Sequence, residues 1–266
     1  MTVSTEKVAT TTTTIPDKRI PSLLNPLHLL KTLYLFTESD FLTFVIPNTL
    51  FGIFSALRGA PLTPTPIPPL TLLHRLPLIL LWNWLNLLIF DLANQRHPTS
   101  LLEDTINKPW RPLPSGLITI PQTRRLLLLA LPLILLLNFT LLGPWQETCL
   151  LYILTWIYND LGAGDHDGPI IRNLVIACAF SQYNKGSLRM ATLAPSYPVP
   201  ITTWSWLAIT SAVIGTTMHV QDLKDQDGDR AKNRQTAPLV WGDSVARWTI
   251  AVPVGVWSLV CPWFWG

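Results

Sequence analysis

The sequence predicts an all-α fold, a polytopic bundle of about seven transmembrane helices. Of its 266 residues, 48% are apolar and only 13% are charged, which is about half the charged share of an ordinary soluble domain. Apolar runs close to the roughly 20 residues that cross a bilayer recur along the chain. The strongest, RRLLLLALPLILLLNFTLL, has almost no polar stripe, whereas a helix of a soluble protein would keep one facing water.

Seven apolar runs are the expected transmembrane helices, and the fourth and fifth are short. They lie at roughly 41–57, 77–92, 126–142, 148–158, 170–182, 201–220 and 248–266. Before them, residues 1–22 are polar and threonine-rich and lack an apolar core. We expect this part to be a disordered tail and not a signal peptide, and residues 23–266 to form the membrane domain.

The acidic residues after residue 40 fall almost wholly into three segments, which follow the second, fourth and sixth runs. They are Asp91, Glu103 and Asp104; then Asp160, Asp165 and Asp167; then Asp222, Asp225, Asp227, Asp229 and Asp243. If the runs alternate across the bilayer, all three segments emerge on one face. Lysines and arginines of the first and third segments place that face in the cytosol, and we expect the endoplasmic reticulum membrane. The opposite connections are poor in charge, except that residues 183–200 contain Lys185 and Arg189.

The third acidic segment, VQDLKDQDGDR, has the spacing of a cation site. Asp222, Asp225 and Asp229 are spaced i, i+3, i+7, so they share one face if the helix continues through them. Carboxylates without cysteine or a histidine pair favour Mg²⁺, which completes its shell with water and phosphate oxygens. A calcium-binding EF-hand has a different spacing. Interleaved bases would contact the phosphate, namely Lys224, Arg230 and Arg234.

The first acidic segment offers a similar set of side chains. Asp91 and Gln95 lie i, i+4 apart at a helix end, and EDTINKPWRP adds Glu103, Asp104, Lys108 and Arg111. Two such clusters at the mouth of an apolar bundle suit a diphosphate whose hydrocarbon tail lies in the membrane, which is a prenyl diphosphate. Mg²⁺ is the predicted cofactor, with metal ligands drawn from both segments, and Asp91, Asp222 and Asp225 are the predicted catalytic residues.

These two segments resemble the aspartate-rich motifs of the UbiA superfamily of intramembrane prenyltransferases. EDTINKPWRPLPSG is similar to the end of the first motif, and DLKDQDGDRAKNRQTAPLVWG is similar to the second. The resemblance covers about residues 40–250. In the first motif, Asp91 and Gln95 stand in two of the places of the family pattern, with an insertion before Glu103 and Asp104. A further stretch, WIYNDLGAGDHD, resembles a fungal subgroup that contains a membrane-bound terpene cyclase.

The resemblance implies a helical bundle around a central cavity that opens at the cytosolic face, and Mg²⁺-assisted loss of diphosphate to give a carbocation. The leading expectation is a terpene cyclase of secondary metabolism that converts farnesyl diphosphate to a sesquiterpene. The alternatives are transfer of the prenyl group to an aromatic or other small acceptor, and an inactive isoform or scaffold. Because the family usually has nine helices, the resemblance implies that two are absent here. We then expect either that this chain alone is less stable and less active than one with two more helices, or that another membrane protein closes the bundle.

Several other residues are candidates for the hydrocarbon cavity. Tyr158, Asn159 and Asp160 close the fourth run and are candidates to orient the diphosphate or a cation, although bonding at the helix end is an equal alternative. Among twelve tryptophans, Trp82, Trp84, Trp204 and Trp206 lie on runs that lead into the acidic segments. Their rings would stabilise a carbocation, and the alternative for most tryptophans is an interfacial belt.

The charge balance argues against nucleic acid as a partner. The net charge is only +3, and no basic patch with interleaved aromatic residues is present in the sequence. The expected partners are therefore the prenyl diphosphate and the lipid bilayer.

Overall fold

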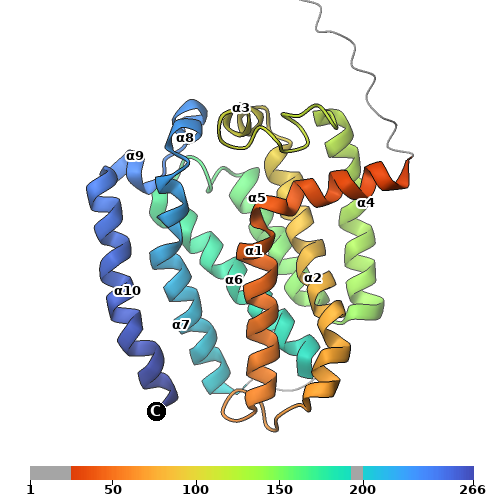
Figure 1. The fold of residues 1–266 in the computed structure, drawn as a ribbon, viewed down its shortest axis with the longest axis vertical. Coiled ribbons are helices and arrows are strands. Elements are labelled where there is room, and N and C mark those ends of the chain that lie inside the picture. The colour runs from red at the N-terminus through yellow and green to blue at the C-terminus, as the bar shows by residue number, and fades with distance from the viewer. Residues whose placement is uncertain (1–24, 193–199) are drawn as a thin grey trace, which may run out of the picture.

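The computed structural model describes residues 25–192 and 200–266, so the predicted tail at residues 1–22 lies outside the described residues. Within the described part every regular element is helical (Figure 1), which confirms the all-α prediction. The seven longest helices are α1 (Pro26–Arg58), α2 (Pro69–Gln95), α4 (Ile120–Leu137), α5 (Trp145–Asn159), α6 (Gly168–Thr192), α7 (Ile201–Thr217) and α10 (Asp243–Trp265). Each contains one of the predicted apolar runs or most of it.

Four of these helices are long and apolar enough to cross a bilayer by length and composition alone. They are α1, α2, α10 and α4 together with the π-helical turn η1 (Asn138–Leu142) that continues it. Leucines such as Leu129 and Leu133 of α4 are more than half exposed. Such a surface suits lipid, since a lipid-facing helix needs no polar stripe.

Prolines and caps set where several helices begin. Proline occupies the first turn of α1, α2 and α4, where its missing N–H costs nothing and its fixed φ favours the helix. The Asn25 side chain accepts a hydrogen bond from the Leu27 amide at 3.1 Å. Thr119 and Gln122 form a capping box at the start of α4. These local interactions set the first residue of each helix and do not depend on packing against other helices.

Close helix packing brings α1, α2 and α6 together at the centre. A Cβ atom on Gly52 of α1 would lie 2.6 Å from the Ser187 backbone of α6, so only glycine permits this approach. Asn83 of α2 joins all three helices, because its amide nitrogen donates to Thr49 Oγ1 at 3.0 Å and to Ser187 Oγ at 2.9 Å. The diagonal course of α6 in Figure 1 brings this helix past several others.

The structure corrects the expected loop at residues 183–200, because α6 continues to Thr192. Lys185 and Arg189 therefore lie on this helix, where both pair with the buried Glu147 of α5 at 3.2 and 2.9 Å. Because the Glu147 carboxylate neutralises these two bases, α6 can continue beyond its apolar run. The charge exception seen in the sequence is thus an ionic cluster in which two half-buried bases surround a buried carboxylate.

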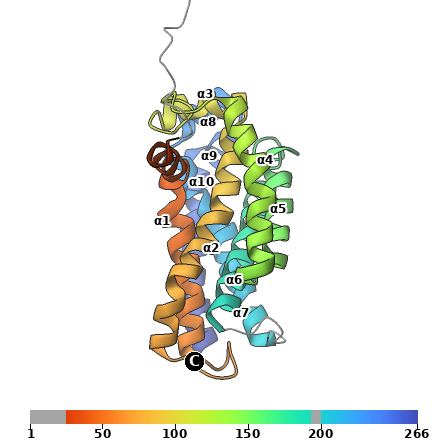
Figure 2. The same cartoon turned by 90° about the vertical axis from the view of Figure 1, so that its right-hand side faces the viewer.

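Three short helices cover one end of the bundle. They are α3 (Pro98–Asn107), α8 (Gln226–Lys232) and α9 (Ala237–Trp241). Both Figure 1 and Figure 2 place α3 and α8 at this end, opposite the C-terminal residue. The Lys232 ammonium group lies 3.3 Å from Glu103 and 3.1 Å from Asp165. These contacts join the three acidic segments at one end, as the alternation of runs predicted.

Candidate active site

A polar pocket of about 70 Å³ lies beneath α3 and α8. Its wall contains carboxylates and bases that come from distant parts of the sequence. The carboxylates are Asp40, Asp91, Glu103, Asp222, Asp225 and Asp229, and the bases are Lys108, Arg111, Arg172 and Arg234. Such a wall can bind a cation and an anionic group next to each other.

The end of α2 contributes Asp91 to this pocket. Asp91 and Gln95 share a helix face as predicted, and both are buried, but Gln95 donates from Nε2 to the Phe36 carbonyl of α1 at 2.8 Å and does not line the pocket. Asn94 lines the wall instead, and its amide donates to Asn159 Oδ1 at 2.9 Å. Asn159 therefore contacts the wall residue Asn94 but does not line the pocket itself.

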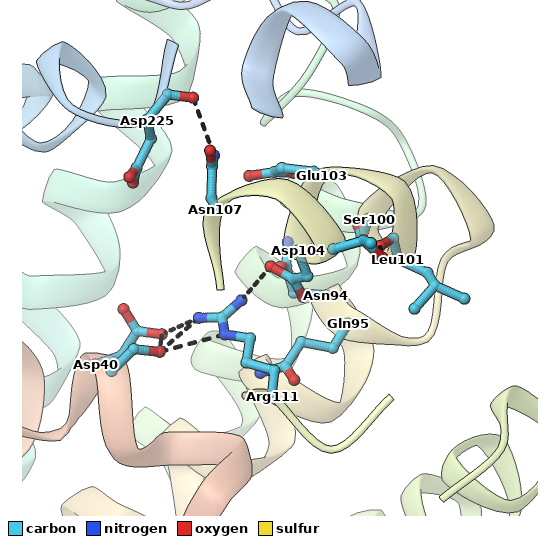
Figure 3. A network of polar contacts seen from close by, with 12 residues as sticks. Asp40, Asn94, Gln95, Ser100, Leu101, Glu103, Asp104, Asn107, Arg111 and Asp225 are labelled. Atoms are coloured by element: carbon cyan, nitrogen blue, oxygen red, sulfur yellow. Dashed lines mark hydrogen bonds and ion pairs between the residues drawn. The ribbon is translucent and has the colours of Figure 1, made fainter. Parts of the chain in front are cut away.

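Arg111 is held between two carboxylates (Figure 3). Its Nη1 donates to Asp104 Oδ1 at 3.0 Å, and its Nη2 donates to Asp40 Oδ2 at 2.8 Å. Ser39 Oγ accepts further bonds from Nη2 and Nε at 2.8 and 3.2 Å. The guanidinium group is buried and its position is fixed from three sides.

Glu103 and Arg234 link the first acidic segment to the third. Arg234 Nη1 lies 2.9 Å from Glu103 Oε1 and 3.4 Å from Asp229 Oδ1. Burial by itself would raise the pKa of Glu103, but the Arg234 guanidinium and the Lys232 ammonium outweigh it and lower the pKa. For Asp229 burial dominates and raises the pKa to about 6. Glu103 is thus an ionised anchor for the two bases.

The helix does not continue through Asp222, Asp225 and Asp229, which was the condition for their sharing one helix face. The chain forms a 3-10 helix η2 (Met218–Leu223), breaks at residues 224–225 and continues as α8. All three carboxylates nevertheless line the pocket, because the break turns α8 across the end of the bundle. Arg172 of α6 donates from Nη1 to Asp222 Oδ2 at 2.7 Å, and both side chains are buried.

The donor set fits Mg²⁺ in its chemistry. Among residues 25–192 and 200–266, no three His, Cys, Asp or Glu side chains converge closely enough to hold a metal ion, since arginines pair with most of the carboxylates. The donors are nevertheless all oxygen, as Mg²⁺ prefers. Asp91, Asp104 and Asp229 each keep a buried carboxylate oxygen without a hydrogen-bond partner in the described part of the chain. Such oxygens are costly unless a ligand satisfies them.

An aromatic cavity adjoins the polar pocket on the side of the bundle interior. Phe44, Phe90, Tyr158 and Ile176 line both spaces. The Phe90 and Tyr158 rings meet edge to face with centroids 5.3 Å apart. The cavity measures about 30 Å³, so side chains have to move before a prenyl chain enters. Aromatic faces attract a carbocation in the way that they attract an ammonium ion.

A larger groove of about 1070 Å³ lies between α6, α7 and α10. Its wall is mostly apolar, and His219 is its one ionisable side chain apart from Cys178 among the residues that the structure describes. A diphosphate would find no lysine or arginine there. The small polar pocket is therefore the better candidate for the chemistry despite its size.

The remaining predicted residues lie outside the polar pocket. Lys224 and Arg230 are exposed, and Arg230 pairs with Asp227 on the surface. Asp160 forms an ion pair with Arg96.

The predicted tryptophans also lie outside the polar pocket and the aromatic cavity. Trp82 is buried behind Tyr183, with ring centroids 6.0 Å apart. Trp84 donates to Thr37 Oγ1 at 2.9 Å. Trp204 lies under the Lys185 ammonium, and Trp206 stacks on Phe264.

Sequence reasoning missed Asp40, Asn94 and Arg172 in the pocket wall. Asp40 and Arg172 sit next to or inside predicted membrane runs, where ionisable residues are costly and mark functional sites. That signal was present in the sequence for both residues. Asn94 gives no such signal, because a polar residue near a helix end is ordinary.

Comparison with known proteins agrees with this geometry. Residues 45–266 match the model of the UbiA prenyltransferase family. The diterpene cyclase eriG of Hericium erinaceus is 31% identical over 84% of this chain and 69% of its own length. The fumagillin beta-trans-bergamotene synthase af520 of Aspergillus fumigatus is 30% identical over 88% and 74%. A UbiA homologue from Archaeoglobus fulgidus bound to GPP and Mg²⁺ has a similar fold, with a TM-score of 0.67 at 16% identity over 88% and 77%.

Fold and site together define a membrane enzyme with a charged pocket at one end of a helical bundle. The chain belongs to the UbiA prenyltransferase family. It is a UbiA-type terpene cyclase or prenyltransferase.

Proposed function

We propose that this enzyme ionises a prenyl diphosphate, with farnesyl diphosphate as the expected substrate, and cyclises the resulting cation to a sesquiterpene. One observation supports this most directly. The pocket of carboxylates and bases shares the wall residues Phe44, Phe90 and Tyr158 with an aromatic cavity. A charged head and an unsaturated tail of one substrate fit these two adjoining spaces.

Mg²⁺ is the proposed cofactor, and Asp91, Asp222, Asp225 and Asp229 are the residues fit to hold it, with Glu103 and Asp104 beside them. When bound, the ion offsets charge on the diphosphate oxygens. Lys108 lines the same wall, and its ammonium group would contact phosphate oxygens that the carboxylates would otherwise repel.

The first step breaks the bond between the prenyl C1 atom and its diphosphate oxygen. Both electrons leave with the diphosphate, and an allylic cation remains. Lys108, Arg172 and Arg234 line the pocket in which the departing negative charge grows, and fixed positive groups lower the barrier to such a step. Phe90 and Tyr158 then face the cation and keep water away from it.

The fate of the cation separates the two candidate activities. In a cyclase, a double bond of the same chain attacks the cation, and loss of a proton ends the reaction as a hydrocarbon. In a prenyltransferase, an aromatic or other small acceptor attacks C1 and then loses a proton. Two relatives named as cyclases at 30% and 31% identity favour the first course, and the family description as prenyltransferases keeps the second open.

Location follows the same proposal. We place the enzyme in the endoplasmic reticulum membrane with α3 and α8 toward the cytosol, because the lysines and arginines around these helices favour that side.

Incubation of the purified protein with Mg²⁺ and farnesyl diphosphate tests the proposed activity. Hydrocarbon extracted without any acceptor supports the cyclase. Product that forms only after an aromatic acceptor is added supports the transferase. If farnesyl, geranyl and geranylgeranyl diphosphates all remain intact, ionisation by this site is refuted.

A further inference from the structure

Asp40 places a carboxylate in the polar pocket from outside the three acidic segments. It lies on α1 and lines the pocket together with Asp91 and Asp225. Its side chain is about one-fifth exposed, so the pocket reaches it. None of the roles proposed above uses this residue.

Two carboxyl groups face the same small space. Asp40 of α1 and Asp91 of α2 both line the polar pocket of about 70 Å³. Asp91 is 1% exposed, and its Oδ2 atom has no hydrogen-bond partner among the described residues. Like charges that face one small pocket repel each other unless a proton or a cation lies between them.

The nearest guanidinium group is already engaged. Arg111 divides its bonds between Asp40 and Asp104, as Figure 3 shows. Lys108 is a second base in the same pocket wall, so Asp40, Asp91 and Asp104 present three carboxylates to two bases. Asn94 and Gln95, the next polar residues of α2, are neutral. The cluster has more negative charge than these two bases balance.

We propose that Asp40 is a further ligand for a divalent cation, which it holds together with Asp91. This inference rests on the proposed function, because the ion would be the one that offsets the diphosphate charge. Asp40 then brings α1 into the site, in addition to the contributions of α2 and α8. The oxygen-only pair matches the preference of Mg²⁺ and of its probe Mn²⁺.

A merely structural role for Asp40 is the alternative, in which the residue does no more than hold Arg111. Ser39→Ala distinguishes the two roles, because the Ser39 hydroxyl accepts two bonds from the same guanidinium at 2.8 and 3.2 Å, whereas its bond to Asp40 Oδ2 is longer, at 3.3 Å. Ser39→Ala loosens Arg111 but leaves the Asp40 carboxylate. The proposal predicts wild-type cation affinity for Ser39→Ala and weakened affinity for Asp40→Asn.

Titration of the full chain in detergent with Mn²⁺, followed by the electron paramagnetic resonance of the free ion, measures this affinity without turnover. We expect Asp40→Asn to weaken one Mn²⁺ site by more than about tenfold, the lower end of the loss when even an outer-shell partner of a metal is removed. Glu38→Gln is the matched control. It removes an exposed carboxylate two residues earlier, whose partner is the Trp110 indole, and it should bind Mn²⁺ as the wild type does.

Unchanged Mn²⁺ binding in Asp40→Asn overturns the inference, as does an equal loss in Ser39→Ala. Should Asp40→Asn fail to fold, the double variant Asp40→Asn/Arg111→Gln removes both charges and keeps the balance of the cluster, and the same loss is expected. A wild-type chain that binds no Mn²⁺ contradicts the metal part of the proposed function as well. A wild type that binds Mn²⁺ with an unaffected Asp40→Asn contradicts only the role of Asp40.

Discussion

The side chain of Asn107 donates from Nδ2 to the Asp225 carbonyl at 2.9 Å, and this bond joins α3 to the third acidic segment (Figure 3). Its Oδ1 atom accepts from the Gly228 amide at 3.2 Å. A Cβ atom on Gly228 would lie only 2.2 Å from Asn107 Nδ2, so the contact requires glycine. Asn107 thus sets how far Glu103 lies from Asp225 and Asp229.

Asn107→Ala should weaken the contact between α3 and α8, two of the short helices that cover one end of the bundle. The substitution leaves a carbonyl and an amide without their partner, which costs about 1–3 kcal/mol of unfolding free energy. We expect turnover to fall by about tenfold, since small displacements of positioning groups cost up to about a hundredfold. Thermal unfolding and diphosphate release measure the two effects. Thr105→Ala is the control, because the Thr105 hydroxyl is exposed and, among the described residues, donates only to the Leu101 carbonyl. Equal behaviour of both variants would contradict the role of Asn107.

Arg172→Met should damage stability and catalysis together. It leaves the buried Asp222 carboxylate without the guanidinium 2.7 Å away, and breaking a buried ion pair costs about 3–5 kcal/mol. Adding Asp222→Asn removes the unpaired charge, so the double variant should regain part of the lost thermal stability but no turnover. Recovery of turnover in the double variant would show that Asp222 is structural.

Asp225→Asn and Asp243→Asn should differ sharply, although both alter an aspartate near α8. Asp225 lines the polar pocket, and loss of one electrostatic group of this kind lowers the rate by about 10²–10³. Asp243 is exposed and pairs only with Arg247 and Gln226 in the described structure, so its substitution should be nearly silent. Release of diphosphate from radiolabelled substrate compares the two. Similar rates for both variants would remove Asp225 from the site.

Much of the bundle was predictable, because membrane helices need long apolar runs that are visible in the sequence. All seven runs correspond to helices. The length of α6 was not predictable, since Lys185 and Arg189 look like loop residues until Glu147 of α5 is known to neutralise them. Long-range pairing of this kind leaves no local signal.

Site residues could be predicted where their spacing along one segment places them together. The prediction failed for residues that only the folding of separate helices brings together. Asp222, Asp225 and Asp229 do line one pocket, although a break at residues 224–225 replaces the expected helix. Asp40 of α1 and Arg172 of α6 lie outside the three acidic segments, and their partners are 71 and 50 residues away in sequence. Only the tertiary fold shows which acids and bases meet.

Substitutions of Lys108 and Arg230 should differ in their effect on the Michaelis constant. Lys108 lines the pocket, whereas the Arg230 side chain is 63% exposed and pairs with Asp227. Contact with the diphosphate in the ground state makes Lys108→Met raise KM as well as lower kcat. Arg230→Met should leave both constants close to wild type. Steady-state kinetics at saturating Mg²⁺ decide the matter, and a raised KM for Arg230→Met alone would reverse the assignment.

Phe90→Leu should change which products form more than how fast diphosphate leaves. Phe90 lines both the polar pocket and the aromatic cavity, and it contacts Tyr158. Removing the Phe90 ring takes away an aromatic face that stabilises the cation and sets the conformation of its hydrocarbon chain. Trp206→Leu is the matched control, since Trp206 stacks on Phe264 away from both spaces. Gas chromatography of the products should show a new distribution for Phe90→Leu only, and an altered distribution for Trp206→Leu alone would place the hydrocarbon elsewhere.

Diphosphate release by the purified chain, measured with farnesyl diphosphate in the presence and absence of Mg²⁺, is the decisive test of ionisation in the polar pocket. We expect release that requires Mg²⁺ in the wild type and is lost in Asp222→Asn, while Asp243→Asn releases diphosphate as the wild type does. Mg²⁺-independent release, or release that persists in a folded Asp222→Asn variant, would contradict ionisation of the substrate in this pocket.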